Sequence, residues 1–313
     1  MAEKTRKMNK KLASILSVLV IVIFIGYIIY DTASPETKKT EAKSEESIKT
    51  NPDKWIISRI FDPEIASLKA VTVSSTGNIF LGGESWVKCY DRDLQPLWKM
   101  KTSKPITALS IVGDTIFASS METIFILNTN GQLKNEWGPY EDNAIITSVS
   151  SNKSFIAFAD AGNKMVIVLN RKGEVKTLIG KTGEQFIVPS PYFDVALTEN
   201  NTLYIANTGN RRIETRGTDG TLVSHFGLPG TAPDAFCGCC NPAHFAVIPE
   251  GFVTAEKGLN RIKILDTEGN FIEFISSENK FIPSIPLDVA SYDGKTIYAA
   301  NPADSKLYVF KRK

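Results

Sequence analysis

Hydrophobic and polar positions divide the chain into one apolar N-terminal run and a long region of short segments. From Trp55 onward, runs of β-branched and aromatic residues are repeatedly interrupted by Gly, Asn and Asp, and no long stretch has helical periodicity. This pattern is typical of strands joined by tight turns. We therefore expect residues 52–313 to form an all-β domain.

One unit recurs along this domain: two strands joined by a short turn, a polar loop, and a third strand that ends in an Asn/Asp-x-x-Gly turn. The clearest copies begin at Phe193 and His244. Six repeats, each long enough for four strands, predict a six-bladed β-propeller, whereas a two-sheet sandwich does not require repeats. The residues that open the six polar loops are Gly83, Ser120, Asp160, Asn207, Glu256 and Asn301.

The two ends of the repeat region fit a closed ring. The last repeat stops after three strands, at Phe310, and an unassigned strand-like segment from Trp55 to Phe61 precedes the first repeat. If this segment supplies the fourth strand of the last blade, no long sheet edge remains open. We therefore expect it to pair with the final strand.

The first 51 residues have a different character. A basic tail at residues 1–11 precedes an uncharged apolar run at residues 12–30, and a segment rich in Lys, Glu, Ser and Thr fills residues 31–51. A helix over the apolar run would rise about 1.5 Å per residue, which nearly spans a hydrocarbon core of about 30 Å. Residues 31–51 have too few apolar side chains to form a core, so they predict a flexible linker.

The basic tail also predicts the orientation of this helix. The positive-inside rule leaves the N-terminus in the cytoplasm and places the propeller in the periplasm or outside the cell. A cleaved signal peptide is the alternative, but its apolar region is usually shorter and ends in a small-x-small site. The sequence thus predicts one transmembrane signal-anchor helix in the cytoplasmic membrane, followed by the propeller.

The balance of charge excludes one class of partner. The chain has 36 Lys and Arg against 34 Asp and Glu, and five of the basic residues lie in the N-terminal tail. No large basic field therefore remains to neutralise nucleic-acid phosphates. We expect a monomeric propeller without a nucleic-acid partner, whose loop face binds a protein or a small molecule.

A short motif in the polar loops suggests a family. Residues 206–213 (ANTGNRRI) follow a predicted strand, and residues 255–262 and 159–166 are looser copies. The motif resembles the signature of NHL-repeat propellers, and the chain looks like a membrane-anchored bacterial-type member. The first two repeats depart from the pattern, with shorter loops and no Asn-x-Arg. The resemblance implies fold more than function, because NHL proteins include scaffolds, ligand and RNA binders and a few enzymes.

A cysteine-rich segment, CGCCNPAH at residues 237–244, lies outside the repeat rhythm. We expect it to join the fourth and fifth blades near the mouth of the central channel. Three interpretations compete: a disulfide (Cys237 with Cys240, or Cys239 with Cys240), a thiol redox site, and a soft-metal site for Cu(I) or Zn(II). Cys89 is expected to be a buried free thiol. The candidate metal ligands are Cys237, Cys239, Cys240 and His244.

Polar residues at equivalent positions of the repeats form a second candidate site. Lactonase-type propellers gather such groups around a divalent, calcium-type ion, although the same ring could simply solvate the channel. Two histidines, His225 and His244, are too few for the zinc site of the related amidating lyases. We expect a binding or accessory module, with a thiol-redox enzyme or a metal-dependent hydrolase as the alternative. The channel-face candidates are Asp160, Asn207, Glu256, Asn301, Asp194 and Asp288.

Overall fold

The computed structural model describes residues 18–25, 54–183, 185–277 and 280–313. The chain divides into two units, residues 1–52 and 53–313, and each is described by itself. In the first unit a helix covers residues 18–25, and no helix among the described residues has the length and apolar character needed to cross a membrane. The basic tail at 1–11, the rest of the predicted span at 12–30 and the linker at 31–51 lie outside the described residues.

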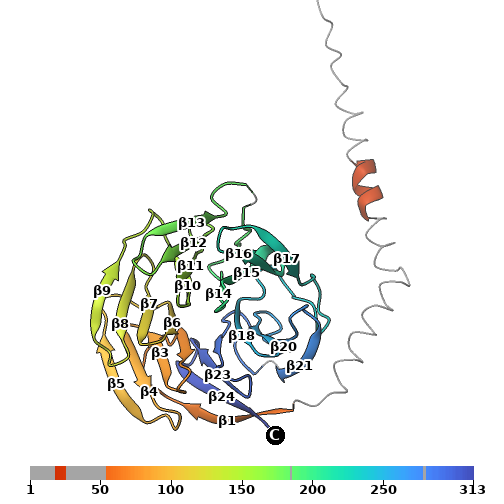
Figure 1. Ribbon diagram of the computed structural model, residues 1–313. Coiled ribbons are helices and arrows are strands. Elements are labelled where there is room, and N and C mark those ends of the chain that lie inside the picture. Colours follow the sequence, from red (N-terminus) through yellow and green to blue (C-terminus); the bar gives the residue numbers. More distant parts are fainter. Residues whose placement is uncertain (1–17, 26–53, 184, 278–279) are drawn as a thin grey trace, which may run out of the picture. The chain divides into compact units, whose positions relative to one another are not determined.

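Six four-stranded antiparallel sheets surround a common axis and form a six-bladed β-propeller, as predicted (Figure 1). The first three blades contain β2 (Ala70–Val73), β3 (Ile79–Gly83), β4 (Trp86–Tyr90) and β5 (Pro96–Lys101); β6 (Ala108–Val112), β7 (Thr115–Ser119), β8 (Ile124–Asn128) and β9 (Leu133–Trp137); and β10 (Ile146–Ser151), β11 (Phe155–Asp160), β12 (Met165–Asn170) and β13 (Val175–Ile179). The other three contain β14 (Val195–Leu197), β15 (Thr202–Asn207), β16 (Arg212–Gly217) and β17 (Leu222–Phe226); β18 (His244–Ile248), β19 (Gly251–Ala255), β20 (Ile262–Leu265) and β21 (Phe271–Ser276); and β22 (Asp288–Ala290), β23 (Thr296–Asn301), β24 (Lys306–Arg312) and β1 (Trp55–Phe61).

The ring closes as the chain ends predicted. Strand β1 pairs antiparallel with β24, so that Trp55 lies opposite Arg312 and Phe61 opposite Leu307. The indole of Trp55 is buried, and its Nε1 donates a hydrogen bond of 3.0 Å to Glu273 in the fifth blade. The first strand therefore completes the sixth blade and also ties it to the fifth.

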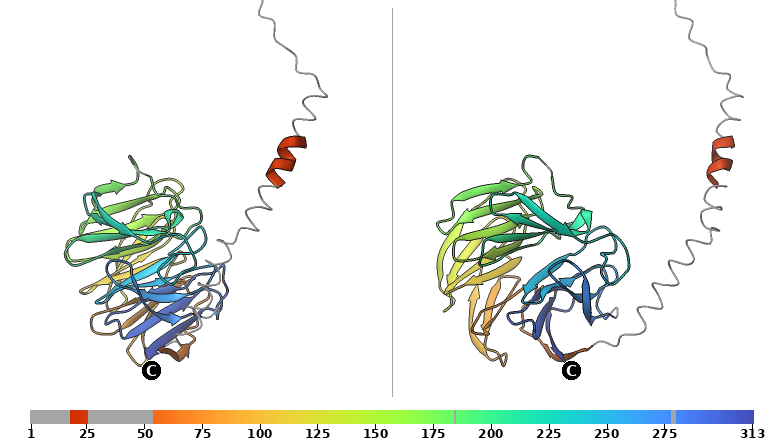
Figure 2. Two further views of the ribbon diagram at one scale, coloured as in Figure 1. Left: turned by 90° about the vertical axis from the view of Figure 1, so that its right-hand side faces the viewer. Right: turned by 45° about the vertical axis from the view of Figure 1, so that its right-hand side comes forward.

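The hydrophobic core lies between neighbouring blades, whose twist is visible from the side (Figure 2). Inner strands such as β12 bury side chains on both faces, whereas the outermost strands, such as β9, are largely exposed. Cys89 packs with Phe80 and Phe125 between the first two blades. Burial raises the pKa of this thiol to about 12, so Cys89 is a buried free thiol, as predicted.

The cysteine-rich segment joins β17 of the fourth blade to β18 of the fifth, as predicted. Cys237 Sγ lies 3.7 Å from the carbonyl oxygen of Lys257, which belongs to the loop between β19 and β20. The connections between blades and the loops between second and third strands therefore share one face of the propeller, which we call the loop face.

Candidate functional site

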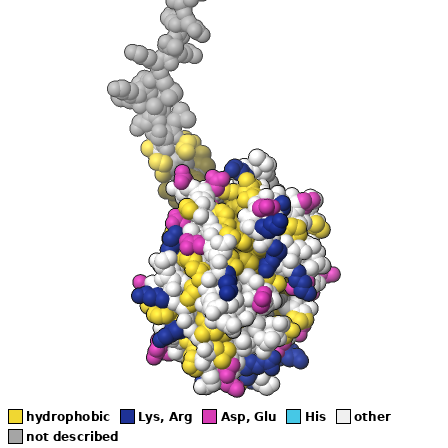
Figure 3. All heavy atoms as spheres, turned by 60° about the vertical axis from the view of Figure 1, so that its left-hand side comes forward, with side chains coloured by type: hydrophobic (Ala, Val, Ile, Leu, Met, Phe, Trp, Pro, Cys, Tyr) yellow, Lys and Arg dark blue, Asp and Glu magenta, His cyan; other side chains and the backbone are white. Residues whose placement is uncertain are grey.

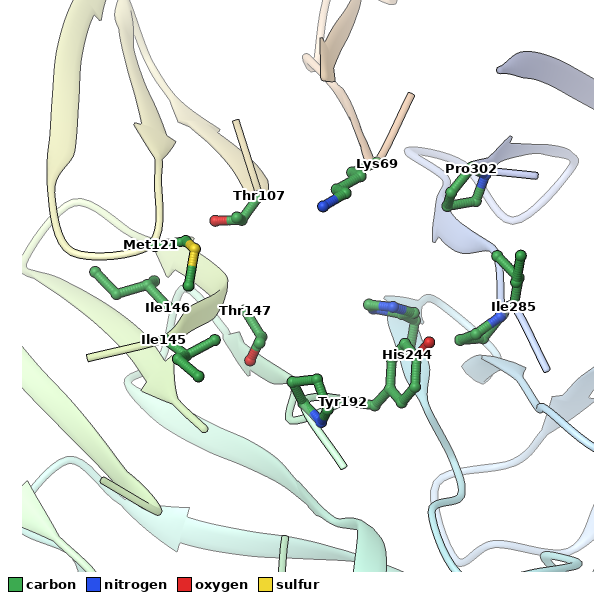
Figure 4. A pocket seen from close by; sticks show the side chains of 12 residues that line it. Lys69, Thr107, Met121, Ile145, Ile146, Thr147, Tyr192, His244, Ile285 and Pro302 are labelled. Carbon is green, nitrogen blue, oxygen red and sulfur yellow. The ribbon is translucent and has the colours of Figure 1, made fainter. Parts of the chain in front are cut away.

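A cavity of about 410 Å³ opens on the loop face, where the inner strands of the six blades begin (Figure 4). Every blade supplies part of its lining, so the cavity lies at the mouth of the central channel. Most of its walls are apolar, and its polar side chains are few. The residues used below are Lys69, Thr107, Met121, Ile145, Thr147, Tyr192, His244, Ile285 and Pro302.

His244 is the titratable group at the centre of this site. It is the first residue of β18, and its Nδ1 lies 3.7 Å from Asp194 Oδ2 and 3.8 Å from Asp288 Oδ1. Burial lowers the pKa of His244, but the contact with Asp194 and the negative charges of both carboxylates outweigh burial and raise it above its ordinary value. The contacts with Asp194 and Asp288 therefore favour the protonated form of the imidazole.

The two carboxylates also fasten neighbouring blades. Asp194 Oδ2 accepts a hydrogen bond of 2.8 Å from the backbone N–H of Phe245, and Asp288 Oδ2 accepts one of 2.8 Å from Val71. Burial raises the pKa of Asp288 to about 7. The structure thus brings together three residues predicted from the sequence, Asp194, His244 and Asp288, although they had been assigned to two different sites.

The other predicted channel residues make hydrogen bonds that hold the polar loops in place. Asp160 accepts hydrogen bonds from the backbone N–H groups of Ile145, Gly162 and Asn163. Asn207 accepts one from Ile187 and donates one to Glu214, and Asn301 accepts one from Ala303. All four of Asp160, Asn207, Glu256 and Asn301 are buried, and none lines the cavity. Their contacts are structural, and a role in the channel stays a prediction.

The cysteines of the loop differ in exposure. Cys237 and Cys240 are buried and Cys239 is exposed, and all three are free thiols. The sulfur atoms of Cys239 and Cys240 lie 3.1 Å apart. Among the described residues no group of three or more His, Cys, Asp or Glu is placed to hold a metal ion. The copper or zinc site on Cys237, Cys239, Cys240 and His244 therefore stays a prediction.

A buried charge cluster holds this loop in place. Glu256 in the β19–β20 loop contacts Arg261 at 3.0 Å and Lys263 at 2.9 Å. Arg261 donates hydrogen bonds to the carbonyl oxygens of Thr231 and Ala235, and Lys263 donates one of 2.7 Å to Ala235. Burial lowers the pKa of Lys263 to about 8. The chain leading to the cysteines is thus anchored by three charged side chains in the fifth blade.

Two further contacts fix the cysteines beside the cavity. The Asn241 amide donates hydrogen bonds to the carbonyl oxygens of Cys237 and Lys257 and accepts one from the Lys257 N–H. The Lys257 ammonium lies 4.9 Å from the centre of the Tyr192 ring, which in turn packs edge-on against His244 at 6.1 Å. Tyr192 therefore lies between His244 and Lys257, whose backbone holds the cysteine-rich loop.

Sequence reasoning missed most of the cavity wall. Lys69, Met121, Ile145, Tyr192 and Ile285 lie in connections between strands, where the repeat has no fixed spacing. Single apolar residues in loops carry no recognisable pattern, so only the closed ring shows that they converge.

Comparison with known proteins supports the fold and leaves the family open. No family model matches the chain. It is 29% identical over 167 residues to 5-deoxyribose 1-phosphate isomerase of Moorella thermoacetica, a match that covers 50% of this chain and 46% of that protein. The chain thus spans about half the length of this curated relative. The resemblance to NHL repeats stays a resemblance.

Several solved propellers have similar structures. Streptogramin B lyase has a TM-score of 0.61 at 14% identity, covering 82% of this chain and 97% of that one. Virginiamycin B lyase from Staphylococcus aureus has a TM-score of 0.60 at 14% identity, covering 81% and 98%. The WD40 propeller domain of Doa1 has a TM-score of 0.56 at 13% identity, covering 79% of both chains. At such identities these similarities establish the propeller fold alone.

Proposed function

We propose that this protein is a binding module that takes a small molecule into the cavity on its loop face. The observation that carries the proposal is the cavity of about 410 Å³, with apolar walls on which the side chains of His244 and Lys69 converge. Ligand sites in proteins typically have volumes of about 300 to 1,000 Å³ and a few polar groups within an apolar lining. All six blades contribute to its lining.

A thermal-shift assay with a mixed panel of small carboxylates, amines, alcohols and sugars tests this proposal. Met121 is 52% exposed at the cavity, so Met121→Trp fills the site without disturbing the core. Leu133 on the outer strand β9 is 51% exposed and gives the control variant Leu133→Trp. Compounds that stabilise the wild type should lose their effect in Met121→Trp alone. A panel without effect, or one that stabilises both variants equally, would overturn the proposal.

We also propose that the propeller works as a monomer outside the cytoplasmic membrane, anchored by residues 12–30. The uncharged apolar run and the basic tail before it support this location. On the face seen in Figure 3, basic and acidic side chains are interspersed, which agrees with a partner other than nucleic acid. Protease treatment of intact spheroplasts should remove the propeller of the full-length chain. Protection from the protease would contradict this topology.

An enzyme is a second candidate because a histidine between two carboxylates can act as a general acid or base. A histidine-to-alanine variant of virginiamycin B lyase, solved with quinupristin, is described as catalytically inactive; its TM-score is 0.53 at 14% identity. Asp194 and Asp288 each accept a backbone N–H and share the His244 ring, whose pKa they raise, so they do not fit a calcium-type ion. Mass spectrometry of quinupristin incubated with the wild type and with His244→Ala would reveal lyase activity; intact quinupristin in both would exclude it.

The paired thiols support a separate proposal for the cysteine-rich segment. We propose that Cys239 and Cys240, whose sulfur atoms are 3.1 Å apart, form a disulfide when the protein reaches an oxidising compartment. Thiol counts under denaturing conditions should then rise by two after reduction. Cys239→Ser should abolish this rise and Cys237→Ser should retain it. Four free thiols before reduction would contradict the disulfide.

A further inference from the structure

Two nitrogen atoms at the cavity, His244 Nε2 and Lys69 Nζ, can donate hydrogen bonds into it. Nδ1 of His244 faces Asp194 and Asp288, so Nε2 lies on the opposite side of the ring, toward the cavity (Figure 4). Lys69 points into the same space from the first blade (Figure 4). Within the described part of the chain, neither His244 Nε2 nor Lys69 Nζ has a hydrogen-bond or ion-pair partner. The Lys69 ammonium and His244 Nε2 therefore converge on the same cavity.

The remaining lining supplies apolar surface and no opposing charge. The described residues that line the cavity include no Asp or Glu. Thr107 and Thr147 use their hydroxyl protons on the carbonyl oxygens of Ser119 and Phe193, so they offer only acceptors. Met121 and Ile145 lie across the cavity from His244, and Ile285 lies beside His244 (Figure 4). A ligand that satisfies both sets of contacts needs an anionic end and an apolar body.

We infer that the ligand is an amphipathic monocarboxylate, an inference that rests on the proposed binding function. Its two carboxylate oxygens accept hydrogen bonds from Lys69 Nζ and His244 Nε2, and its apolar body packs against Met121, Ile145 and Ile285. Two donors match two oxygens, whereas phosphate sites usually add backbone N–H groups or arginines. An apolar body of roughly eight carbons suits a cavity of this size.

Isothermal titration with octanoate, octanamide and octylammonium at pH 6.5 tests this inference with ligands of equal length. Octanoate should bind about tenfold more tightly than octanamide, because a hydrogen bond to a charged group is stronger than a neutral one. Octylammonium should bind most weakly. Lys69→Gln and His244→Gln should each remove most of the preference for octanoate and leave the affinity for octanamide within about twofold. Lys172→Gln, in an exposed turn on the opposite face, is the control.

The outcomes separate the ligand class from the binding function. Equal affinity for octanoate and octanamide, with both abolished by Met121→Trp, would overturn the carboxylate inference and leave the binding function standing. Tighter binding of octyl phosphate than of octanoate would overturn it in favour of a phosphate monoester. A preference for octanoate that survives both Lys69→Gln and His244→Gln would also overturn it. Lys69 is exposed, so its variant will fold even if the His244 variant does not.

Discussion

Two charged clusters meet at the fifth blade, and they differ in how completely their members are paired. In the buried cluster, Glu256 contacts Arg261 and Lys263, and the remaining donors of both cations bind loop carbonyl oxygens. At the channel mouth, Asp194 and Asp288 are paired with His244 on one side of its ring only. The other side of the ring and Lys69 face the cavity.

This difference separates residues that hold the fold from residues available to a ligand. Buried polar groups are normally fully hydrogen-bonded, since an unpaired one costs folding free energy. A fully paired cluster therefore stabilises the chain and offers nothing to a partner. Donors that converge on a cavity without acceptors are satisfied only by water or a ligand. Both clusters combine carboxyl groups with cationic side chains, but only the buried one pairs them on every side.

The largest effect should follow from breaking the fully paired cluster. Glu256→Ala leaves Arg261 and Lys263 buried without their counter-charge, and such a loss costs about 3 to 5 kcal/mol of unfolding free energy. Urea denaturation at constant pH measures the change. Glu268→Ala, at an exposed carboxylate in the same blade, should change it by less than about 0.5 kcal/mol. A loss from Glu256→Ala as small as that of the control would show that the cluster is not what holds the loop.

The half-paired cluster should respond more weakly to the same kind of change. Asp194→Ala removes the acceptor for the Phe245 N–H, which costs about 1 to 3 kcal/mol. It also removes one of the two charges that raise the pKa of His244, so that pKa should fall. NMR titration of the two histidines measures the shift, with His225 as an internal reference. An unchanged His244 pKa in Asp194→Ala would mean that Asp194 does not stabilise the protonated imidazole.

The exposed residue Asp142 provides the matched control for this variant. Asp142→Ala should leave both the His244 titration and the unfolding free energy unchanged within about 0.5 kcal/mol. If it shifted the titration as much as Asp194→Ala, the effect would be one of net charge and not of contact.

The sequence predicted the ring better than it predicted the site. The repeat spacing and the strand at Trp55 to Phe61 were sufficient for six blades and their closure, because strand periodicity and turn residues are local signals. The sequence also singled out His244, Asp194 and Asp288. The sequence could not show that these three residues lie close together, because their proximity depends on three blades meeting at one axis. Lys69 carried no local signal at all, since one lysine in a loop resembles any other.

The pH dependence of stability tests the channel mouth without any ligand. Asp288 faces His244 and Asp194, with Lys69 across the cavity, and burial raises its pKa to about 7. The native protein therefore binds a proton that the unfolded chain, with a carboxyl pKa near 4, has already released. Unfolding free energy should fall as pH rises from about 4 to 7 on account of this group.

His244 extends the same trend to higher pH. Its raised pKa adds stability that is fully present below its unfolded pKa of about 6.5 and is lost as pH rises through the folded value. Urea denaturation at a series of pH values should show the protein more stable at pH 5.5 than at pH 8, and Asp288→Asn should flatten the part of the slope below pH 7. If the unfolding free energy of Asp288→Asn changed with pH as steeply as that of the wild type, groups other than Asp288 would cause the pH dependence.

The smallest expected effect is a change in the rate of disulfide closure when Lys257, whose charge acts on Cys240, is replaced. Burial raises the pKa of Cys240, while the positive charge of Lys257 acts against that rise. Lys257→Gln should therefore raise the pKa further, reduce the thiolate fraction at Cys240, and slow closure of the Cys239–Cys240 disulfide about two- to threefold. One equivalent of 4,4′-dithiodipyridine forms a mixed disulfide at the exposed Cys239 and releases one thiopyridone, and attack by Cys240 then closes the disulfide and releases a second. The rate of the second release measures this effect, with Lys172→Gln as the matched control. An unchanged rate would mean that the ammonium acts only on the Tyr192 ring, so that Lys257 would belong with the fully paired residues that hold the loop.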